Sequence, residues 1–187
     1  PFNTCAGTPV IIGGSPTATA APGNSITNYL WTPIGGYTPG NNVANPSVSP
    51  TVSTIYNVLV TDNFGCQQIG QALVNVYAAD AGPDKSSCSG NTVRIGTAPI
   101  VGVPGVIYSW TASPADPTMS CTNCAQPDVH PTVTTTYTLT LTLPVSGGGT
   151  CTTTDAVVVS VVTAPTNNGG AFGGPDVTVC YSGSDII

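Results

Sequence analysis

Apolar and polar side chains alternate along much of this chain. The alternation is clearest over residues 136–143, where every second residue is a threonine. The apolar residues between the threonines are Tyr137, Leu139, Leu141 and Leu143. A period of two places successive side chains on opposite faces of an extended strand. The pattern therefore predicts strands that have one face in a core and the other in solvent.

Shorter runs repeat this pattern elsewhere in the chain. Their apolar positions are Tyr56, Val58 and Val60, then Val74 and Val76, and finally Val157, Val159 and Val161. The chain has 18 prolines and 22 glycines, which interrupt these runs at short intervals and leave no stretch for a long helix. Many short strands separated by turn residues are typical of antiparallel sandwiches. We therefore predict an all-β fold of antiparallel β-sandwich modules.

The chain also aligns with itself, which indicates a tandem repeat. The matched pairs are Cys5 and Cys88, Val10-Ile11-Ile12-Gly13 and Val93-Arg94-Ile95-Gly96, Tyr29-x-Trp31 and Tyr108-x-Trp110, and Cys66 and Cys151. A Pro-x-Val-x-Pro-Thr-x-x-Thr-x-Tyr stretch also occurs twice, ending at Tyr56 and at Tyr137. We predict one module over residues 1–79 and a second over residues 80–164.

A third copy of the repeat begins near the end of the sequence. Gly82-Pro83-Asp84 precedes Cys88 and returns as Gly174-Pro175-Asp176 before Cys180. We therefore expect residues 165–187 to hold a linker and the first strand of a third, incomplete module. The same pattern predicts that the chain is a segment of a longer array.

Charge excludes some classes of partner. Charged residues are 5% of the chain, against about 25% in an ordinary soluble protein, and Lys85 and Arg94 are its only basic residues. Two cations cannot form the basic stripe that displaces counterions from a nucleic acid, and an anionic membrane surface is disfavoured for the same reason. No apolar run approaches the roughly 20 residues of a membrane helix. The net charge of −6 would tolerate divalent cations.

Seven cysteines in a small β-rich chain predict disulfides and an oxidising compartment. Cys5 and Cys66 occupy the same places in module one as Cys88 and Cys151 do in module two. We predict that each of these pairs is an intramodule disulfide. Cys180 aligns with Cys5 and Cys88, so we expect it to be unpaired within this segment.

Cys121 and Cys124 form a Cys-x-x-Cys motif that has no counterpart in the first module. A local structural disulfide is the reading that we favour. A redox site is an alternative, but it usually requires a helix N-terminus. Zinc is a second alternative, but it would need two further ligands, and His130 is the only histidine.

The repeated motifs resemble known modules. The two Tyr-x-Trp strands, the two proline- and threonine-rich stretches and Thr61-Asp62-Asn63-Phe64-Gly65-Cys66 are similar to tandem PKD-like and Ig-like β-sandwich repeats. They look most like the repeats of large Bacteroidetes cell-surface proteins, including the mobile adhesins of gliding species. The resemblance covers nearly the whole chain. It implies export to the extracellular cell surface and a role in adhesion or filament assembly.

The residues offer little for catalysis. The chain has no Glu, and His130 aligns with Ser49, so we expect a solvated loop histidine and no enzyme. Cofactors are not expected, with one alternative: Asp80, Asp84 and Asp176 recur at module boundaries and could help to bind Ca²⁺, although Gly-Pro-Asp is also an ordinary turn sequence.

Aromatic side chains are the remaining candidates for contact. Trp31 and Trp110 are equivalent in the two modules, which favours core packing over stacking on a sugar. Tyr37, Phe64 and Phe172 are better candidates for exposed contacts. We predict a structural and adhesive stalk whose partners are neighbouring repeats of the same chain or fibre, with polysaccharide as a further candidate. A carbohydrate-binding module of a secreted protein is the alternative.

Overall fold

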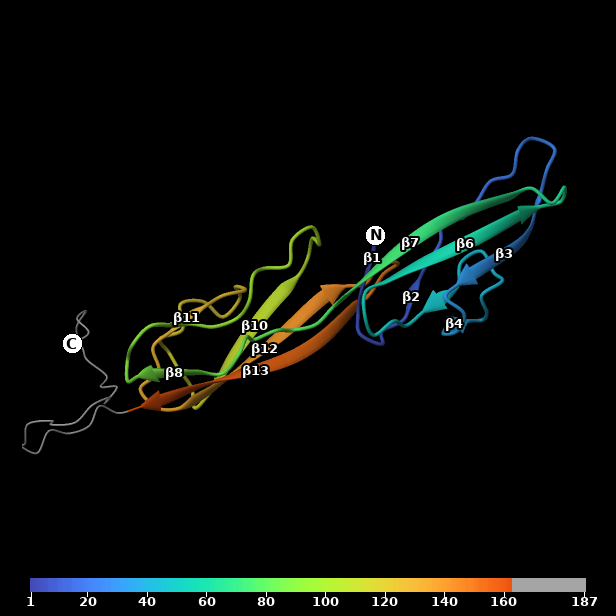
Figure 1. Ribbon diagram of the computed structural model, residues 1–187. Coiled ribbons are helices and arrows are strands. Elements are labelled where there is room, and N and C mark those ends of the chain that lie inside the picture. The colour runs from blue at the N-terminus through green and yellow to red at the C-terminus, as the bar shows by residue number, and fades with distance from the viewer. Residues whose placement is uncertain (163–187) are drawn as a thin grey trace, which may run out of the picture. The chain divides into compact units, whose positions relative to one another are not determined.

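The computed structural model describes residues 1–162 (Figure 1). All regular secondary structure in that range is β-strand. The predicted third module, with Asp176 and Cys180, lies outside the described residues. Residues 1–162 contain no helix of the length and apolarity needed to cross a bilayer. The fold is an all-β sandwich, as the alternating pattern predicted.

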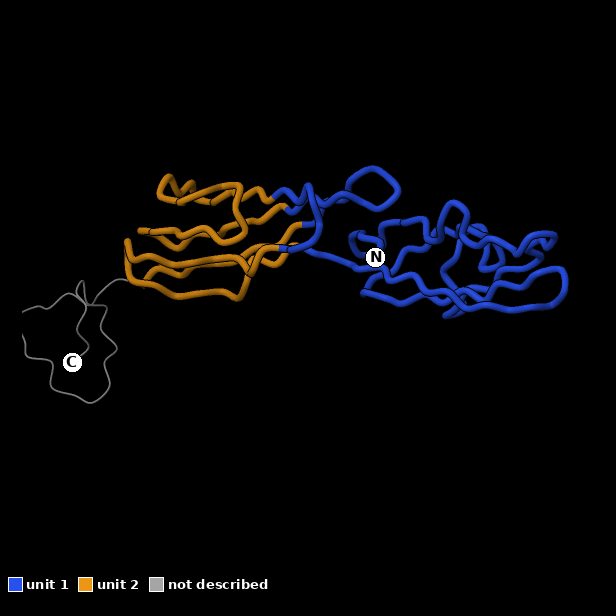
Figure 2. Tube along the Cα trace, turned by 90° about the horizontal axis from the view of Figure 1, so that it is seen from above, with its two compact units in different colours: residues 1–78, 100–107, 141–153 blue, residues 79–99, 108–140, 154–187 orange. Residues whose placement is uncertain are grey.

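The chain divides into two compact units (Figure 2). Unit 1 contains Pro1–Ala78 together with two later segments, Ile100–Ile107 and Leu141–Thr153. Unit 2 contains Ala79–Pro99, Tyr108–Thr140 and, among the described residues, 154–162. The break after residue 78 lies close to the expected module boundary. The two later segments were expected in the second module, yet they pack within unit 1.

Unit 1 contains seven strands of the first repeat. They are β1 (Phe2–Cys5), β2 (Val10–Ile11), β3 (Ile26–Thr32), β4 (Tyr37–Thr38), β5 (Ser47–Val48), β6 (Thr54–Asp62) and β7 (Gln67–Tyr77). One sheet has the order β1-β7-β6-β3, and the other has the order β2-β5-β4. β1 runs parallel to β7, whereas β3, β6 and β7 are antiparallel neighbours.

The second repeat has the same topology except that it lacks a counterpart of β4 among the described residues. Its strands are β8 (Lys85–Cys88), β9 (Val93–Arg94), β10 (Ile107–Ser113), β11 (Asp128–Val129), β12 (Thr135–Pro144) and β13 (Thr150–Val162). The sheet order β8-β13-β12-β10 matches β1-β7-β6-β3 strand for strand, and β8 again runs parallel to β13. β9 pairs with β11 as β2 pairs with β5.

Hydrogen bonds outside the sheets also repeat. The indole Nε1 of Trp31 donates to the carbonyl of Val43 at 2.9 Å, and that of Trp110 donates to the carbonyl of Cys124 at 2.9 Å. The Pro50 carbonyl accepts the amide of Gly7, and the Pro131 carbonyl accepts the amide of Gly90. The sequence repeat is therefore a structural repeat down to its loop contacts.

Each unit has its own core around its tryptophan. In unit 1, Trp31 packs with Val10, Ile12, Val48, Tyr56, Val58, Val60, Ala72 and Val74. In unit 2, Trp110 packs with Ala81, Val93, Ile95, Val129, Tyr137, Leu139, Val157 and Val159. The apolar positions of the alternating runs supply most of both sets. The burial predicted from the period of two is correct at these positions.

A buried tyrosine and a carboxylate distinguish unit 2 from unit 1. The hydroxyl of the fully buried Tyr137 donates to Oδ2 of Asp116 at 2.5 Å. Burial raises the pKa of Tyr137, and the hydrogen bond to Asp116 raises it further. Burial alone would raise the pKa of the Asp116 carboxyl, but hydrogen bonds from Thr118 and Tyr137 hold it below its ordinary value.

Replacing Asp116 by asparagine is expected to lower the free energy of unfolding at neutral pH by about 1–2 kcal/mol. A carboxyl whose folded pKa is depressed contributes stability above its unfolded pKa, and this contribution disappears as the pH falls through the folded pKa. The difference between wild type and Asp116→Asn should therefore shrink at acid pH. Urea unfolding at neutral pH and at about pH 2 measures it. A difference that stays constant between these conditions would contradict this assignment.

The predicted disulfides Cys5–Cys66 and Cys88–Cys151 are wrong. The structure joins Cys5 to Cys151, with 6.0 Å between their Cα atoms, and leaves Cys66 as an exposed free thiol. Cys88 is also in a disulfide, though not with Cys151. The free thiol expected at Cys180 lies outside the described residues, and the structure places one at Cys66.

Strand direction explains the error. Because β1 is parallel to β7, Cys5 lies beside Tyr77 at one end of β7, whereas Cys66 precedes Gln67 at the other end. At about 3.3 Å per residue, the length of β7 separates them by roughly 35 Å, far beyond the reach of a disulfide. The parallel pair β8–β13 separates Cys88 from Cys151 in the same way.

Candidate functional site

The Cys5–Cys151 disulfide lies in a small apolar cluster within unit 1. Cys5, Leu143 and Cys151 are buried there at 2%, 0% and 7% exposure. The partly buried residues around them are Tyr77, Ile100, Val103, Val106 and Val145. We call the set Asn3, Cys5, Leu143, Val145, Ser146 and Cys151 the hairpin junction, because it joins β1 to the turn between β12 and β13.

Backbone hydrogen bonds fix the hairpin junction in addition to the sulfur bridge. The amide of Asn3 donates to Oγ of Ser146 at 2.8 Å, and the amide of Ser146 donates to the carbonyl of Asn3 at 3.0 Å. The amide of Val145 donates to the Gly149 carbonyl, which closes the turn. The outer edge of β1 is thus bonded to residues that come much later in the chain.

Apolar packing is continuous from the main core of unit 1 into the hairpin junction. Val145 packs against the cluster around Trp31 and also against the cluster around Cys5. Leu143 is the last apolar position of the alternating run that begins at Tyr137, so the sequence predicted its burial. The sequence did not identify Asn3, Val145 or Ser146. The alternating run indicates that the Leu143 side chain is buried, but it does not indicate which residues bury it.

Cys66 occupies in β6–β7 the place that Cys151 occupies in β12–β13. Its turn is held by Asp62, whose Oδ1 accepts the amides of Phe64 and Cys66, each at 2.9 Å. Oδ2 of Asp62 accepts a hydrogen bond from Nδ2 of Asn24 at 2.7 Å. Desolvation acts to raise the pKa of Asp62, but these three bonds and the amide of Gly65 hold it below its ordinary value. The thiol is therefore presented on a well-ordered turn.

Cys121 and Cys124 are joined to each other, which is the local structural disulfide that the sequence favoured for this motif. The carbonyl of Cys124 accepts the Trp110 indole, and the carbonyl of Thr122 accepts the Trp110 amide at 2.8 Å. In unit 1 the carbonyls of Val43 and Asn41 make these contacts without a disulfide. The short bridge thus closes a loop that caps a core tryptophan.

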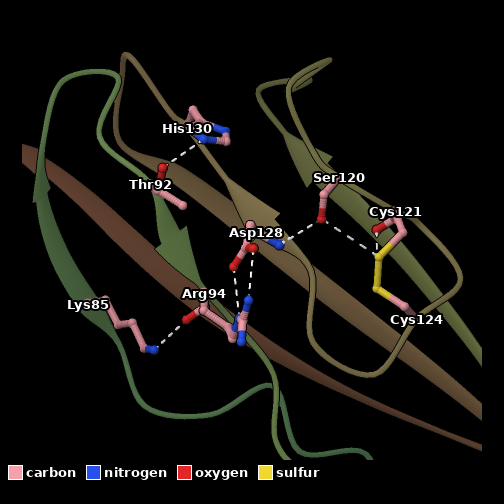
Figure 3. Close-up of polar contacts among 8 residues, drawn as sticks. All are labelled: Lys85, Thr92, Arg94, Ser120, Cys121, Cys124, Asp128 and His130. Atoms are coloured by element: carbon pink, nitrogen blue, oxygen red, sulfur yellow. Dashed lines mark hydrogen bonds and ion pairs between the residues drawn. A yellow bond between two sulfur atoms is a disulfide. The ribbon is translucent and has the colours of Figure 1, made fainter.

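A polar cluster covers the β9–β11 pair of unit 2 (Figure 3). Arg94 and Asp128 form a bidentate ion pair at 2.9 and 3.0 Å. The hydrogen bond and the opposite charge raise the pKa of Arg94, and the Arg94 hydrogen bond lowers the pKa of Asp128. Nζ of Lys85 donates to the Arg94 carbonyl.

His130 lies at the edge of this cluster. Its Nε2 is 2.9 Å from the Thr92 hydroxyl, and its amide donates to Oγ1 of Thr118 at 3.0 Å. Ser120 Oγ accepts the amide of Asp128 (Figure 3), so it is held in the loop that contains the short disulfide. These contacts tie two strands and a loop together, and they do not aim the imidazole at a serine hydroxyl.

The two described candidates for calcium binding accept backbone amides. Oδ1 of Asp80 accepts the amide of Gly82 at 3.0 Å, and Oδ1 of Asp84 accepts that of Val158 at 2.8 Å. Oδ2 of Asp155 accepts the amide of Ala81 at 2.7 Å. No group of three side chains able to hold a metal occurs among the described residues. Asp176 lies outside them, so the calcium alternative stays a prediction.

The aromatic candidates differ in exposure. Trp31 and Trp110 are 1% and 3% exposed, so neither offers a face to a sugar. Tyr37 is not free for contacts either, because its ring packs edge-on against Tyr56 with centroids 5.8 Å apart. Burial, followed by the proximity of Tyr56, raises the pKa of Tyr37 to about 12. Phe64 is 72% exposed and stands beside Cys66.

No protein-family model matches the chain, and no curated protein matches it. It is similar, at low identity, to several solved structures. One is a Bacteroides ovatus protein, the mixed-linkage glucan utilization locus SGBP-B in complex with a mixed-linkage heptasaccharide (16% identity, 87% of this chain, 43% of that chain, TM-score 0.27). Another is the insect immune protein hemolin (15% identity, 86% and 44%, TM-score 0.34).

A third is the fibronectin(III)-like modules of Clostridium thermocellum CbhA (9% identity, 86% and 89%, TM-score 0.28). The chain spans less than half the length of the first two.

Proposed function

We propose that this chain is a non-catalytic, load-bearing segment of a secreted cell-surface stalk or fibre, in which each repeat is clamped to the next one. The observation that carries the proposal is the Cys5–Cys151 disulfide, which spans 146 positions and joins the first strand of one repeat to the hairpin of the following repeat. The resemblance of the repeats to PKD-like and Ig-like modules and the disulfide content support the extracellular setting.

The arrangement of the bridge suits tension along the chain. A pull applied to the two ends of the chain reaches the bridge before it reaches the strands between Cys5 and Cys151. Those strands are β2 to β12, whereas β1 before Cys5 and the part of β13 after Cys151 lie on the loaded part of the chain. Force is therefore carried by a covalent bond, and the hydrogen-bonded ladders between the cysteines are shielded from it.

The outer face of unit 1 supplies a contact surface. Leu30, Leu59 and Ile69 are adjacent across β3, β6 and β7, and Ile55 lies opposite Leu73. Four of these five are at least 39% exposed: Leu30, Ile55, Ile69 and Leu73. In the second repeat, the residues aligned with Ile55, Leu59 and Ile69 are threonines. This apolar face supports lateral packing against a neighbouring fibre, which is the adhesive part of the proposal.

Stretching single molecules by their two ends tests the mechanical part. An extended chain spans about 3.3–3.6 Å per residue, so the disulfide should hide about 500 Å of chain that only a reduced molecule can release. We expect Cys151→Ala under oxidising conditions to release the part of this length that the Cys88 disulfide does not hold, and the reduced wild type to release all of it. Cys66→Ala is the matched control, and it should behave as the oxidised wild type does.

Extension traces that are the same for oxidised wild type, reduced wild type and Cys151→Ala would remove the mechanical basis of the stalk. Release of the full length between Cys5 and Cys151 by the oxidised wild type would also remove this mechanical basis.

A further inference from the structure

The exposed thiol of Cys66 has a counterpart whose partner is known. Cys66 and Cys151 both stand at the start of the last strand of their repeat, just after the turn. Cys151 is buried in a disulfide, whereas Cys66 is exposed and free. Each of the other described cysteines is already in a disulfide. A partner for Cys66 must therefore come from beyond the described residues.

The surroundings of Cys66 also resemble the hairpin junction without the strand that covers the hairpin of the second repeat, which is β1. Phe64 follows Asp62 in the β6–β7 turn as Val145 follows Leu143 in the β12–β13 turn. Val145 is half-buried because it packs in the hairpin junction, but Phe64 is 72% exposed. An apolar side chain and a thiol are thus both uncovered at the place where the second repeat receives β1.

Asp62 stands where Leu143 does, and it does not prevent such coverage. Its carboxylate already accepts hydrogen bonds from Phe64, Cys66 and Asn24. A strand docked there would not strip the charge of its hydrogen-bonding partners.

From these matches we infer that Cys66 forms a disulfide with the first-strand cysteine of a preceding repeat of the same kind, and that Phe64 packs against that strand. The partner is placed in the preceding repeat because of the observed Cys5–Cys151 bond. In that bond the first-strand cysteine belongs to one repeat and the hairpin cysteine to the next repeat along the chain. The inference rests on the proposed stalk and extends it. The array becomes a ladder in which each bridge of the Cys5–Cys151 kind is staggered by one repeat.

Bond formation requires a disulfide oxidant, such as glutathione disulfide. The Cys66 thiolate attacks one of its sulfurs and releases one glutathione thiol. The thiolate of the first-strand cysteine then attacks the mixed disulfide at Cys66 and releases the second glutathione thiol. Two protein thiols are oxidised, and one glutathione disulfide is reduced to two thiols.

A doubled chain tests the inference directly. Residues 1–175 followed by the complete chain place Cys5 of the second copy at the position of Cys180. The sequence separation between Cys88 of the first copy and Cys66 of the second is then about the same as that between Cys5 and Cys151. After refolding in a glutathione redox buffer, free thiols are alkylated at low pH. Peptic peptides are then mapped by mass spectrometry without reduction, since trypsin has only Lys85 and Arg94 to cut.

We expect Cys66 of the second copy to be linked to Cys88 of the first, in place of the disulfide that Cys88 has in the single chain, and Cys66 of the first copy to be alkylated. Cys88→Ala in the first copy should restore alkylation of the second Cys66. Phe64→Ser in the second copy should slow formation of the link without changing the Cys5–Cys151 bonds.

The Cys5–Cys151 bonds in both copies show that the doubled chain has folded. If they form while Cys66 of the second copy is alkylated, the inference is wrong and the stalk proposal is unaffected. If the Cys5–Cys151 bonds do not form, the partner of Cys66 is identified instead by peptide mapping of the protein taken from intact cells. Cys66 linked to a cysteine in a Cys-(x)4-Val-x-Ile-Gly sequence upstream supports the inference, and Cys66 found alkylated or linked elsewhere overturns it.

Discussion

Replacing Cys151 by alanine is expected to lower the free energy of unfolding of unit 1 by about 5 kcal/mol. In the chain-entropy model the cost grows with the logarithm of the loop, and a separation of 146 residues gives a value near the upper end of the usual range. The loss is a large share of the ~5–15 kcal/mol available to a domain. Cys5 would remain as a buried thiol, which behaves as a small apolar side chain and adds little further cost.

The two tryptophans make this measurement specific. Trp31 lies in the core of unit 1 and Trp110 in that of unit 2, and the chain has no other tryptophan. In a Trp110→Phe background, urea unfolding followed by fluorescence therefore reports on unit 1. Cys66→Ala is the matched control and should change the free energy by less than about 0.5 kcal/mol, since the thiol is exposed. A loss below about 1 kcal/mol for Cys151→Ala would mean that the bridge does not stabilise unit 1.

Local patterning predicted the sandwich well because its causes are local. The alternation over residues 136–143 appears directly in β12, whose residues alternate between buried and half-buried from Thr135 to Pro144. The aligned Tyr-x-Trp strands became β3 and β10, and their tryptophans make the same contacts. These features depend on the period of a strand and on the packing of one large side chain, and a single sequence carries both.

Disulfide pairing could not be predicted in the same way, because it depends on strand direction. Equivalent positions in two repeats show that Cys5 and Cys66 have fixed places, but not that β1 runs parallel to β7. An antiparallel β1 would have brought Cys5 to the start of β7, next to Cys66. A bond between repeats satisfies the repeat symmetry as well as a bond within one repeat does. Only the direction of β1 relative to β7 separates these two arrangements.

The candidate site was therefore recognised in part. The cysteines were identified as the residues that matter, and Leu143 was placed in a core. The partners of the hairpin junction, Asn3 and Ser146, have no sequence signal, because their bonds use the backbone and a common hydroxyl. Long-range contacts of this kind need a known topology before any residue can be named.

Replacing Gly96 by alanine is expected to lower the free energy of unfolding of unit 2 by about 3–5 kcal/mol. Gly96 has a φ of +81°, in the left-handed region that costs other residues about 1–2 kcal/mol. The larger part of the cost is steric. An added Cβ would collide with the carbonyl oxygen of Ala125 and would lie 3.1 Å from Cζ2 of Trp110.

Neither side of this contact is free to move away. The amide of Gly96 donates to the carbonyl of Ala81 at 3.0 Å, which fixes the backbone that carries the new Cβ. The opposing segment is fixed next to Ala125, because the Cys124 carbonyl accepts the Trp110 indole. Relief of the collision would therefore break a buried hydrogen bond or displace the central tryptophan. Either change falls among the most damaging kinds of core substitution.

Gly90→Ala is the control that separates conformation from collision. Gly90 has a similar φ of +77°, and its amide also donates to a carbonyl, that of Pro131, but nothing lies within 4 Å of its added Cβ. It should cost only the backbone share, about 1–2 kcal/mol. Fluorescence of Trp110 in a Trp31→Phe background measures both variants. If the two variants lose the same free energy of unfolding, the contact with Ala125 adds nothing to the cost of a positive φ. The Ala125 segment would then move away from the new methyl group without a measurable loss of stability.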